Sequence, residues 1–281
     1  MGPTTMGLVH LMDTASPDQY TFQVQGSADA VSVPMVAGQI DIALLPINLA
    51  AVLYNKTAGK VKLAAVNTLG VLYVVSNDDT VQQLSDLTGR TVLNTGKGTT
   101  PQFVLEKALT GIDDVTIDYR SQPTEVASVL STTPNTIAVL PEPYVTAALD
   151  ANIDVHIVAD LNQAWQAATG SPLVTSCVAV RTDFADARPA AFTDFMTQYA
   201  ASVAFTNDDP AEAAPLIVAQ QLAPNEKVAL DAIPRAHIVF MTGANAKIAV
   251  QAYLAVLFAA DPASIGGTLP GDDFFMDVPS A

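Results

Sequence analysis

Residues 41–50 read DIALLPINLA and join a buried strand to a helix. The apolar run at residues 40–45 predicts the strand, and residues 47–56 predict the helix that follows Pro46. The same alternation continues on both sides of this stretch. Further strands are expected at residues 20–25, 61–66, 69–75, 90–93, 115–119, 137–140 and 155–158, and further helices at residues 28–37, 101–109, 124–130 and 143–149. Short apolar strands that alternate with helices are typical of an α/β protein.

The last third of the chain is expected to be mainly helical. Phe192, Phe195, Met196 and Tyr199 are spaced i, i+3, i+4, i+7, which predicts a stripe of side chains facing a core. With 281 residues, the chain is long enough for about two domains. No linker rich in Pro, Gly or Ser separates them, so we expect the chain to cross between domains within strands, near residues 70–76 and 172–178.

Acidic residues outnumber basic residues by 28 to 12, which gives a net charge of −16. This balance argues against nucleic acid as a partner, because phosphate binding depends on clustered Lys and Arg. It also argues against docking on an anionic membrane. No membrane-spanning helix is expected, and no secretory signal is evident. Cys177 is the one cysteine, so we expect no internal disulfide and a small buried apolar side chain.

Three expected helix starts combine small, hydroxyl and Pro residues in a way that suits ligand binding. They are Gly2-Pro3-Thr4-Thr5, Gly96-Lys97-Gly98-Thr99-Thr100-Pro101 and Pro141-Glu142-Pro143-Tyr144. Unpaired N–H groups at helix N-termini attract polar or anionic groups, and Gly and Thr let a ligand approach the backbone. Ordinary helix capping explains the same residues equally well. Lys97 is expected either to neutralise an anionic ligand or to be a solvated loop lysine.

Residues suited to catalysis or metal binding are scattered along the chain. His10, His156 and His237 stand apart, without a second His or Cys at the spacing of metal ligands. The nucleophile motif G-x-S-x-G is absent, and the turn that contains Lys97 departs from the P-loop pattern. We therefore expect no catalytic residue, no metal, no cofactor and no enzymatic activity.

Several stretches together resemble a known family. They are residues 2–8 (GPTTMGL), 41–43 (DIA), 46–50 (PINLA), 67–72 (NTLGVL), 87–91 (LTGRT), 95–101 (TGKGTTP) and 140–143 (LPEP). In order and spacing they resemble the nitrate/sulfonate/taurine (SsuA/THI5-like, NMT1-like) class of ABC-transporter substrate-binding proteins. The resemblance covers nearly the whole chain, although no single motif is very specific.

The resemblance implies the type II periplasmic-binding-protein fold, with two α/β lobes joined by two crossover segments. Lobe 1 would be discontinuous, at residues 1–72 and 176–281, and lobe 2 would be inserted at residues 73–175. Relatives have a strand before the turn that holds residues 2–5, so the first strand of lobe 1 is expected to be missing, together with any export signal or lipid-anchor cysteine.

The same resemblance implies a ligand site in the cleft between the lobes. Carried over by position, the contacts would be Thr4, Thr5, Met6, Asn48, Asn67, Thr68, Lys97, Gly98, Thr99, Thr100, Glu142, Tyr144, Thr175 and Ser176. No arginine falls among these positions. Many binders of carboxylates and sulfonates use a bidentate Arg, so the ligand would be neutral or held by backbone donors.

The function implied is the solute-binding component of an ABC importer, extracytoplasmic (in the periplasm or on the cell surface) and lipid-anchored in its full-length form. It would be a monomer that captures a small polar or anionic organic ligand, closes by hinge motion and delivers it to permease and ATPase subunits. Sulfonate, nitrate, a pyrimidine and an aromatic acid all stay open as ligands. The alternatives are a small-molecule enzyme on the same fold, THI5-like or menaquinone-pathway-like, and a sensor domain with a fused effector segment.

Overall fold

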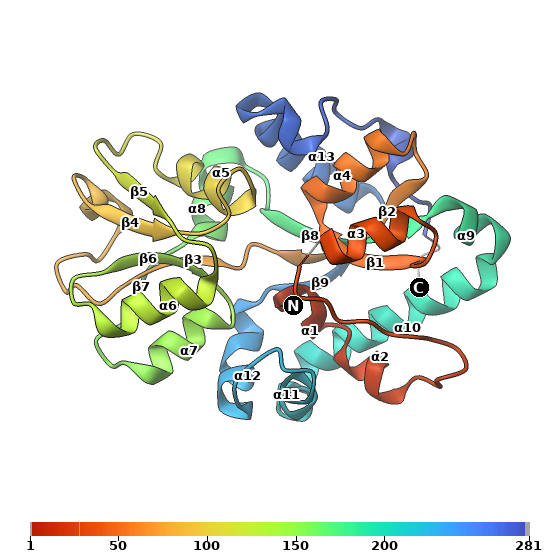
Figure 1. Cartoon of the computed structure of the whole chain (residues 1–281), viewed down its shortest axis with the longest axis horizontal. Coiled ribbons are helices and arrows are strands. Elements are labelled where there is room, and N and C mark those ends of the chain that lie inside the picture. The colour runs from red at the N-terminus through yellow and green to blue at the C-terminus, as the bar shows by residue number, and fades with distance from the viewer. Residues whose placement is uncertain (1, 28, 279–281) are drawn as a thin grey trace. The chain divides into compact units, whose positions relative to one another are not determined.

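The structure is a computed structural model that describes residues 2–27 and 29–278 (Figure 1). The chain divides into two compact units. Unit 1 consists of Met1–Leu69 and Val174–Ala281, and unit 2 is Gly70–Leu173. The chain passes from one unit to the other just after β2 and just before β8, which belong to unit 1. Ala28, the first residue of the helix expected at 28–37, lies outside the described residues.

Unit 1 is built on a four-stranded sheet with the order β1-β8-β2-β9. The strands are β1 (Ile42–Pro46), β2 (Val61–Leu69), β8 (Val174–Arg181) and β9 (Ile238–Met241). All neighbouring pairs are antiparallel. Strand β8, one of the two inner strands, is buried at six of its eight residues.

Helices flank this sheet and supply most of the core. They are α1 (Pro3–Met6), α2 (Val9–Thr14), α3 (Asp29–Val36), α4 (Ile47–Lys56), α9 (Thr182–Ala187), α10 (Pro189–Asp208), α11 (Pro210–Ala219), α12 (Glu226–Ala232) and α13 (Gly243–Ala260), with 3-10 turns η2 (Ile233–Arg235), η3 (Pro262–Ile265) and η4 (Asp272–Phe274). The stripe predicted on α10 is confirmed, because all four of its side chains are buried.

Helix α13 is long and apolar enough, by length and composition, to cross a membrane. Its buried side chains include Val250, Tyr253 and Leu257, and the helix contacts β2 and β8 of the same unit. A helix packed against a sheet in this way is a core helix, and length with hydropathy alone is weak evidence for a membrane span.

Unit 2 is built on a five-stranded mixed sheet with the order β5-β4-β6-β3-β7. The strands are β3 (Leu72–Ser76), β4 (Thr91–Asn94), β5 (Thr116–Tyr119), β6 (Ile137–Pro141) and β7 (His156–Asp160), and the helices are η1 (Leu84–Leu87), α5 (Thr100–Ala108), α6 (Pro123–Thr132), α7 (Tyr144–Ala151) and α8 (Leu161–Thr169). Strand β4 is parallel to β5 and β6, whereas β3 is antiparallel to β6 and β7. The α/β fold class expected from the sequence is confirmed.

One predicted strand is wrong. Residues 20–25 form no strand in the described structure. A strand exists only when a neighbouring backbone offers hydrogen-bond partners, and the sheet of unit 1 ends at β1. These residues therefore run without a sheet neighbour.

Candidate functional site

In unit 1, the polar candidates gather where β1 and β2 end and β8 begins. Both Pro46 and Thr68 pair with Ser176 across the sheet, so the three strand ends lie at one edge. Asn67 and Thr175 are neighbours of these residues in the chain. Strand ends of this kind are where ligands bind in open α/β sheets.

Asn67 is the centre of a buried hydrogen-bond network at this edge. Its Nδ2 donates to the Thr4 carbonyl at 3.1 Å and to the Tyr199 hydroxyl at 2.9 Å. Its Oδ1 accepts from the Ser176 hydroxyl at 2.8 Å. The side chain of Asn67 is 1% exposed. Because both amide hydrogens and the amide oxygen are used internally, Asn67 fixes α1 and α10 to β2.

The other candidates of unit 1 differ in how accessible they are. Met6 and Thr68 are buried, so Met6 belongs to the core. Thr4 and Thr5 are partly exposed and line a cavity of about 600 Å³ within the unit. The Thr175 hydroxyl donates to the Leu69 carbonyl at 2.6 Å. Asn48 donates to the Ser264 carbonyl at 3.4 Å.

In unit 2, the parallel strands β4 and β6 end at one edge of the sheet, and the turn before α5 follows β4. Lys97, Gly98 and Thr99 of this turn are exposed. The Gly98 N–H donates to Gln102 Oε1 at 2.7 Å, and the Thr99 hydroxyl donates to the Gly96 carbonyl at 2.6 Å. The turn is therefore held in shape by its own side chains.

Lys97 and Thr100 complete this exposed turn. The Lys97 ammonium lies 5.8 Å from the ring centroid of Tyr119, which is within reach of a cation–π contact. Burial, and then the nearby Glu106 carboxylate, raise the pKa of Tyr119. Thr100 is the first residue of α5 and is partly exposed.

Glu142 and Tyr144 lie at the end of β6 and the start of α7. The Glu142 side chain is fully buried, and its carboxylate accepts from the Thr146 N–H at 3.2 Å and from the Thr146 hydroxyl at 2.8 Å. Tyr144 is partly buried and packs against the apolar core of unit 2. In the described structure, the Glu142 carboxylate thus satisfies donors in the first turn of α7.

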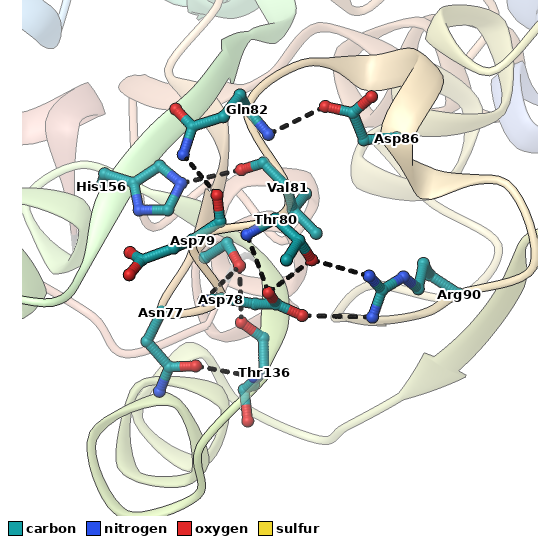
Figure 2. A network of polar contacts seen from close by, with 11 residues as sticks. Asn77, Asp78, Asp79, Thr80, Val81, Gln82, Asp86, Arg90, Thr136 and His156 are labelled. Atoms are coloured by element: carbon teal, nitrogen blue, oxygen red, sulfur yellow. Dashed lines mark hydrogen bonds and ion pairs between the residues drawn. The ribbon is translucent and has the colours of Figure 1, made fainter.

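A second polar network of unit 2 lies at the opposite edge of its sheet, after β3 (Figure 2). The Asp78 carboxylate accepts from the Thr80 hydroxyl and N–H and from Arg90 at 3.1 Å. These Thr80 hydrogen bonds, with a smaller effect of the Arg90 charge, lower the pKa of Asp78. His156 Nε2 lies 2.8 Å from the Val81 carbonyl. The network joins the loop after β3 to β7 and to the start of β4, which makes it structural.

The thiol and two of the three imidazoles, those of His10 and His156, are buried or lie away from both candidate edges. Cys177 is fully buried in β8, and burial raises the pKa of its thiol. His10 stacks on Phe205 with ring centroids 4.0 Å apart, and His156 belongs to the network after β3. Within residues 2–27 and 29–278, no group of three His, Cys, Asp or Glu side chains could hold a metal ion.

Comparison with known protein families shows the family to which this chain belongs. A family model described as menaquinone biosynthesis matches residues 4–255, which is most of the chain. The chain belongs to the menaquinone biosynthesis family. No match was found among curated proteins.

Three solved structures show what this family member resembles in three dimensions. An ABC transporter from Parabacteroides distasonis is 24% identical, with 98% of this chain and 96% of that chain covered and a TM-score of 0.85. The periplasmic aliphatic sulphonate binding protein SsuA from Escherichia coli is 16% identical, with 94% and 91% covered and a TM-score of 0.74. The ligand-binding component of an ABC-type import system from Staphylococcus aureus, solved with zinc bound, is 14% identical, with 99% and 92% covered and a TM-score of 0.71.

These likenesses confirm the type II periplasmic-binding-protein fold that the sequence implied. The sequence did not indicate four polar residues of the two edges, namely Asn94, Gln102, Tyr119 and Tyr199. Asn94 Nδ2 donates to the Pro101 carbonyl at 3.3 Å, which ties β4 to the first turn of α5. An Asn that ends an apolar strand just before a Gly-rich turn is a signal that could have indicated this role.

Proposed function

We propose that this member of the menaquinone biosynthesis family is the solute-binding component of an ABC importer. It would bind a small polar or anionic organic molecule and carry out no chemistry on it. One observation carries the proposal. The two candidate edges carry threonine hydroxyls and one ammonium, at Thr4, Thr5, Thr175 and the turn 97–100, whereas the thiol and two of the imidazoles are fixed elsewhere. Such groups suit recognition of a polar ligand.

The structural neighbours add support, since they include an ABC transporter, an import-system component and a sulphonate-binding protein. The proposal includes an extracytoplasmic location with a lipid anchor, and permease and ATPase subunits as partners. Hinge closure stays a prediction, and small-angle scattering with and without ligand measures it.

A second candidate is an enzyme that acts on a small molecule, and the family match favours it. The buried Glu142 carboxylate lies at the end of β6, two residues before Tyr144, the partly buried candidate at the start of α7.

A thermal-shift screen over sulfonates, nitrate, pyrimidines and aromatic acids tests both candidates, because a ligand that binds only the folded state raises the melting temperature. Each ligand that stabilises the protein is then incubated with it and analysed by mass spectrometry. Recovery of unchanged ligand supports the importer component. Conversion to a product supports the enzyme and refutes our proposal.

Matched variants test whether the turn before α5 in unit 2 contributes to the ligand site. Thr99→Phe puts a bulky side chain on the exposed turn before α5, and Thr110→Phe puts the same side chain beyond the other end of α5, also on an exposed threonine. We expect Thr99→Phe to weaken binding at least about tenfold and Thr110→Phe to leave it unchanged. Equal affinities would remove the turn from the site.

A further inference from the structure

Four polar side chains from three elements of unit 2 gather beside the exposed turn before α5. Lys97 lies on the turn, Gln102 and Glu106 lie one helical turn apart on α5, and Tyr119 is the last residue of β5. Strand β5 is parallel to β4 and pairs with it up to Asn94, the last residue of β4 (Figure 1). All of these residues belong to one unit.

A relay of hydrogen bonds joins Glu106 to the backbone of the turn. Glu106 Oε1 accepts from Gln102 Nε2 at 2.7 Å, and Gln102 Oε1 accepts from the Gly98 N–H at 2.7 Å. A carboxylate only accepts hydrogen bonds, so Glu106 orients the Gln102 amide with its oxygen toward the turn. The relay therefore holds the Glu106 carboxylate beside the turn that carries Lys97.

Tyr119 lies close to both charges of this group. The Lys97 ammonium is 5.8 Å from the centroid of the Tyr119 ring. After burial, the nearby Glu106 carboxylate is the second cause of the raised pKa of Tyr119. Both charged side chains are exposed. Within residues 2–27 and 29–278, neither charge has an ion-pair partner, and Glu106 Oε2 accepts no hydrogen bond. An ammonium and a carboxylate oxygen are thus both available to a third molecule.

The two charges cancel, and this balance limits the kind of ligand group that fits. A simple anion that approaches Lys97 is repelled by Glu106, because like charges repel each other. A molecule with an anionic group at one end and an ammonium at the other meets an opposite charge at each end. Charge-assisted hydrogen bonds are roughly twice as strong as neutral ones, so the bipolar molecule gains from both residues and the anion from only one.

We propose, on the basis of the ligand-binding function proposed above, that this turn binds a zwitterionic ligand of the amino acid type. The anionic group of the ligand lies at Lys97, and its ammonium lies at Glu106. Glu106 is then a specificity-determining residue that selects zwitterions over simple anions. Such a ligand has no net charge, and its anionic group needs no arginine.

NMR titration of the full chain with three probes of similar size tests the proposal. The probes are β-alanine, a zwitterion, propionate, an anion, and propylammonium, a cation, followed at the amides of residues 97–100. We expect the unmodified chain to bind β-alanine at least about tenfold more tightly than the other two. Glu106→Gln keeps an acceptor for Gln102. It should weaken β-alanine binding at least about fivefold and strengthen propionate binding about threefold, and both effects should shrink at high salt.

Asp113→Asn is the matched control, because it removes the same charge from an exposed side chain beyond the other end of α5. It should leave all three affinities unchanged. If Glu106→Gln lowers the yield of folded protein, Lys97→Met serves as the second variant. It should weaken β-alanine and propionate binding alike and spare propylammonium.

The outcomes separate this inference from the proposed function. Equal effects of Glu106→Gln and Asp113→Asn, or tighter binding of propionate than of β-alanine by the unmodified chain, would overturn the inference alone. Unchanged amides at residues 97–100 with every probe up to about 100 mM would overturn it as well. The proposed function fails only if the thermal-shift screen and these probes together yield no ligand.

Discussion

Replacing Asn67 with alanine should destabilise unit 1 far more than a surface amide replacement does. The change removes four hydrogen bonds of a buried side chain, at 2.8, 2.9, 3.1 and 3.5 Å. A hydrogen bond contributes about 0.5–1.5 kcal/mol net, and an unsatisfied buried partner adds to the loss. The expected cost is therefore roughly 2–4 kcal/mol. Asn48→Ala is the matched control, since it removes one bond of 3.4 Å from a partly exposed side chain, and it should cost less than about 1 kcal/mol.

The chain carries a probe for each unit. Cys177, the lone cysteine, is buried in β8 next to β2, whereas the lone tryptophan, Trp165, is buried in α8 of unit 2. Thiol labelling of Cys177 under native conditions measures the opening of unit 1, while tryptophan fluorescence shows that unit 2 stays folded. Because 1.4 kcal/mol is a factor of ten, Asn67→Ala should label roughly 30- to 800-fold faster than the unmodified chain.

The reasoning is refuted if Asn67→Ala labels within about threefold of the unmodified chain, or if Asn48→Ala accelerates labelling as much as Asn67→Ala does. Either result would mean that the network around Asn67 does not hold α1 and α10 to the sheet.

Three other perturbations have defined outcomes. The pKa of Asp78 is lowered in the folded state, so its carboxylate contributes stability that is lost as pH falls through that pKa. Asp78→Asn should therefore flatten the acid-induced loss of stability of unit 2 below about pH 4, measured by tryptophan fluorescence. Replacement of the exposed Asp79 by Asn is the control and should keep the original slope. Gly70→Ala places a Cβ 2.6 Å from the Cβ of Asn162 and should lower the free energy of unfolding in urea by about 1–3 kcal/mol. Gly26→Ala is the control, because its Cβ meets nothing within 4 Å, and it should change the free energy of unfolding by less than about 0.5 kcal/mol. The thiol of Cys177, whose pKa is raised by burial, should resist alkylation at pH 8 until urea unfolds the chain; labelling at the rate of a free thiol would contradict its burial.

Much of the fold could be predicted because local pattern and burial agree in this chain. The helix expected at residues 47–56 has those bounds in the structure, and β6 is one residue longer than expected. Both follow from apolar runs whose ends are marked by Pro or by a change of period. The parallel pair β4 and β6 brings the turn 97–100 and the end of β6 to one edge of unit 2, as the general geometry of α/β sheets requires.

The network at the edge of unit 1 could be predicted only in part. The family resemblance implied Asn67 and Ser176 as site residues, and the structure joins them by a hydrogen bond. Tyr199 was assigned to the apolar stripe of α10, which is right for its ring. Its hydroxyl, however, meets Asn67 from 132 positions away in the chain. Periodicity shows which face of a helix is buried, but the partner of a polar atom on that face is set by the tertiary fold.

Residues 20–25 show that two properties of a strand, its alternating burial and its hydrogen-bond pairing, can occur separately. A strand was predicted here, and the alternation of partly buried and exposed side chains typical of a half-buried strand is present at residues 20–24, where Tyr20 contacts α10. The ladder of hydrogen bonds is absent, since it depends on a backbone lying about 4.8 Å away. The sequence thus determines the face that a segment buries, while pairing is a property of its neighbours.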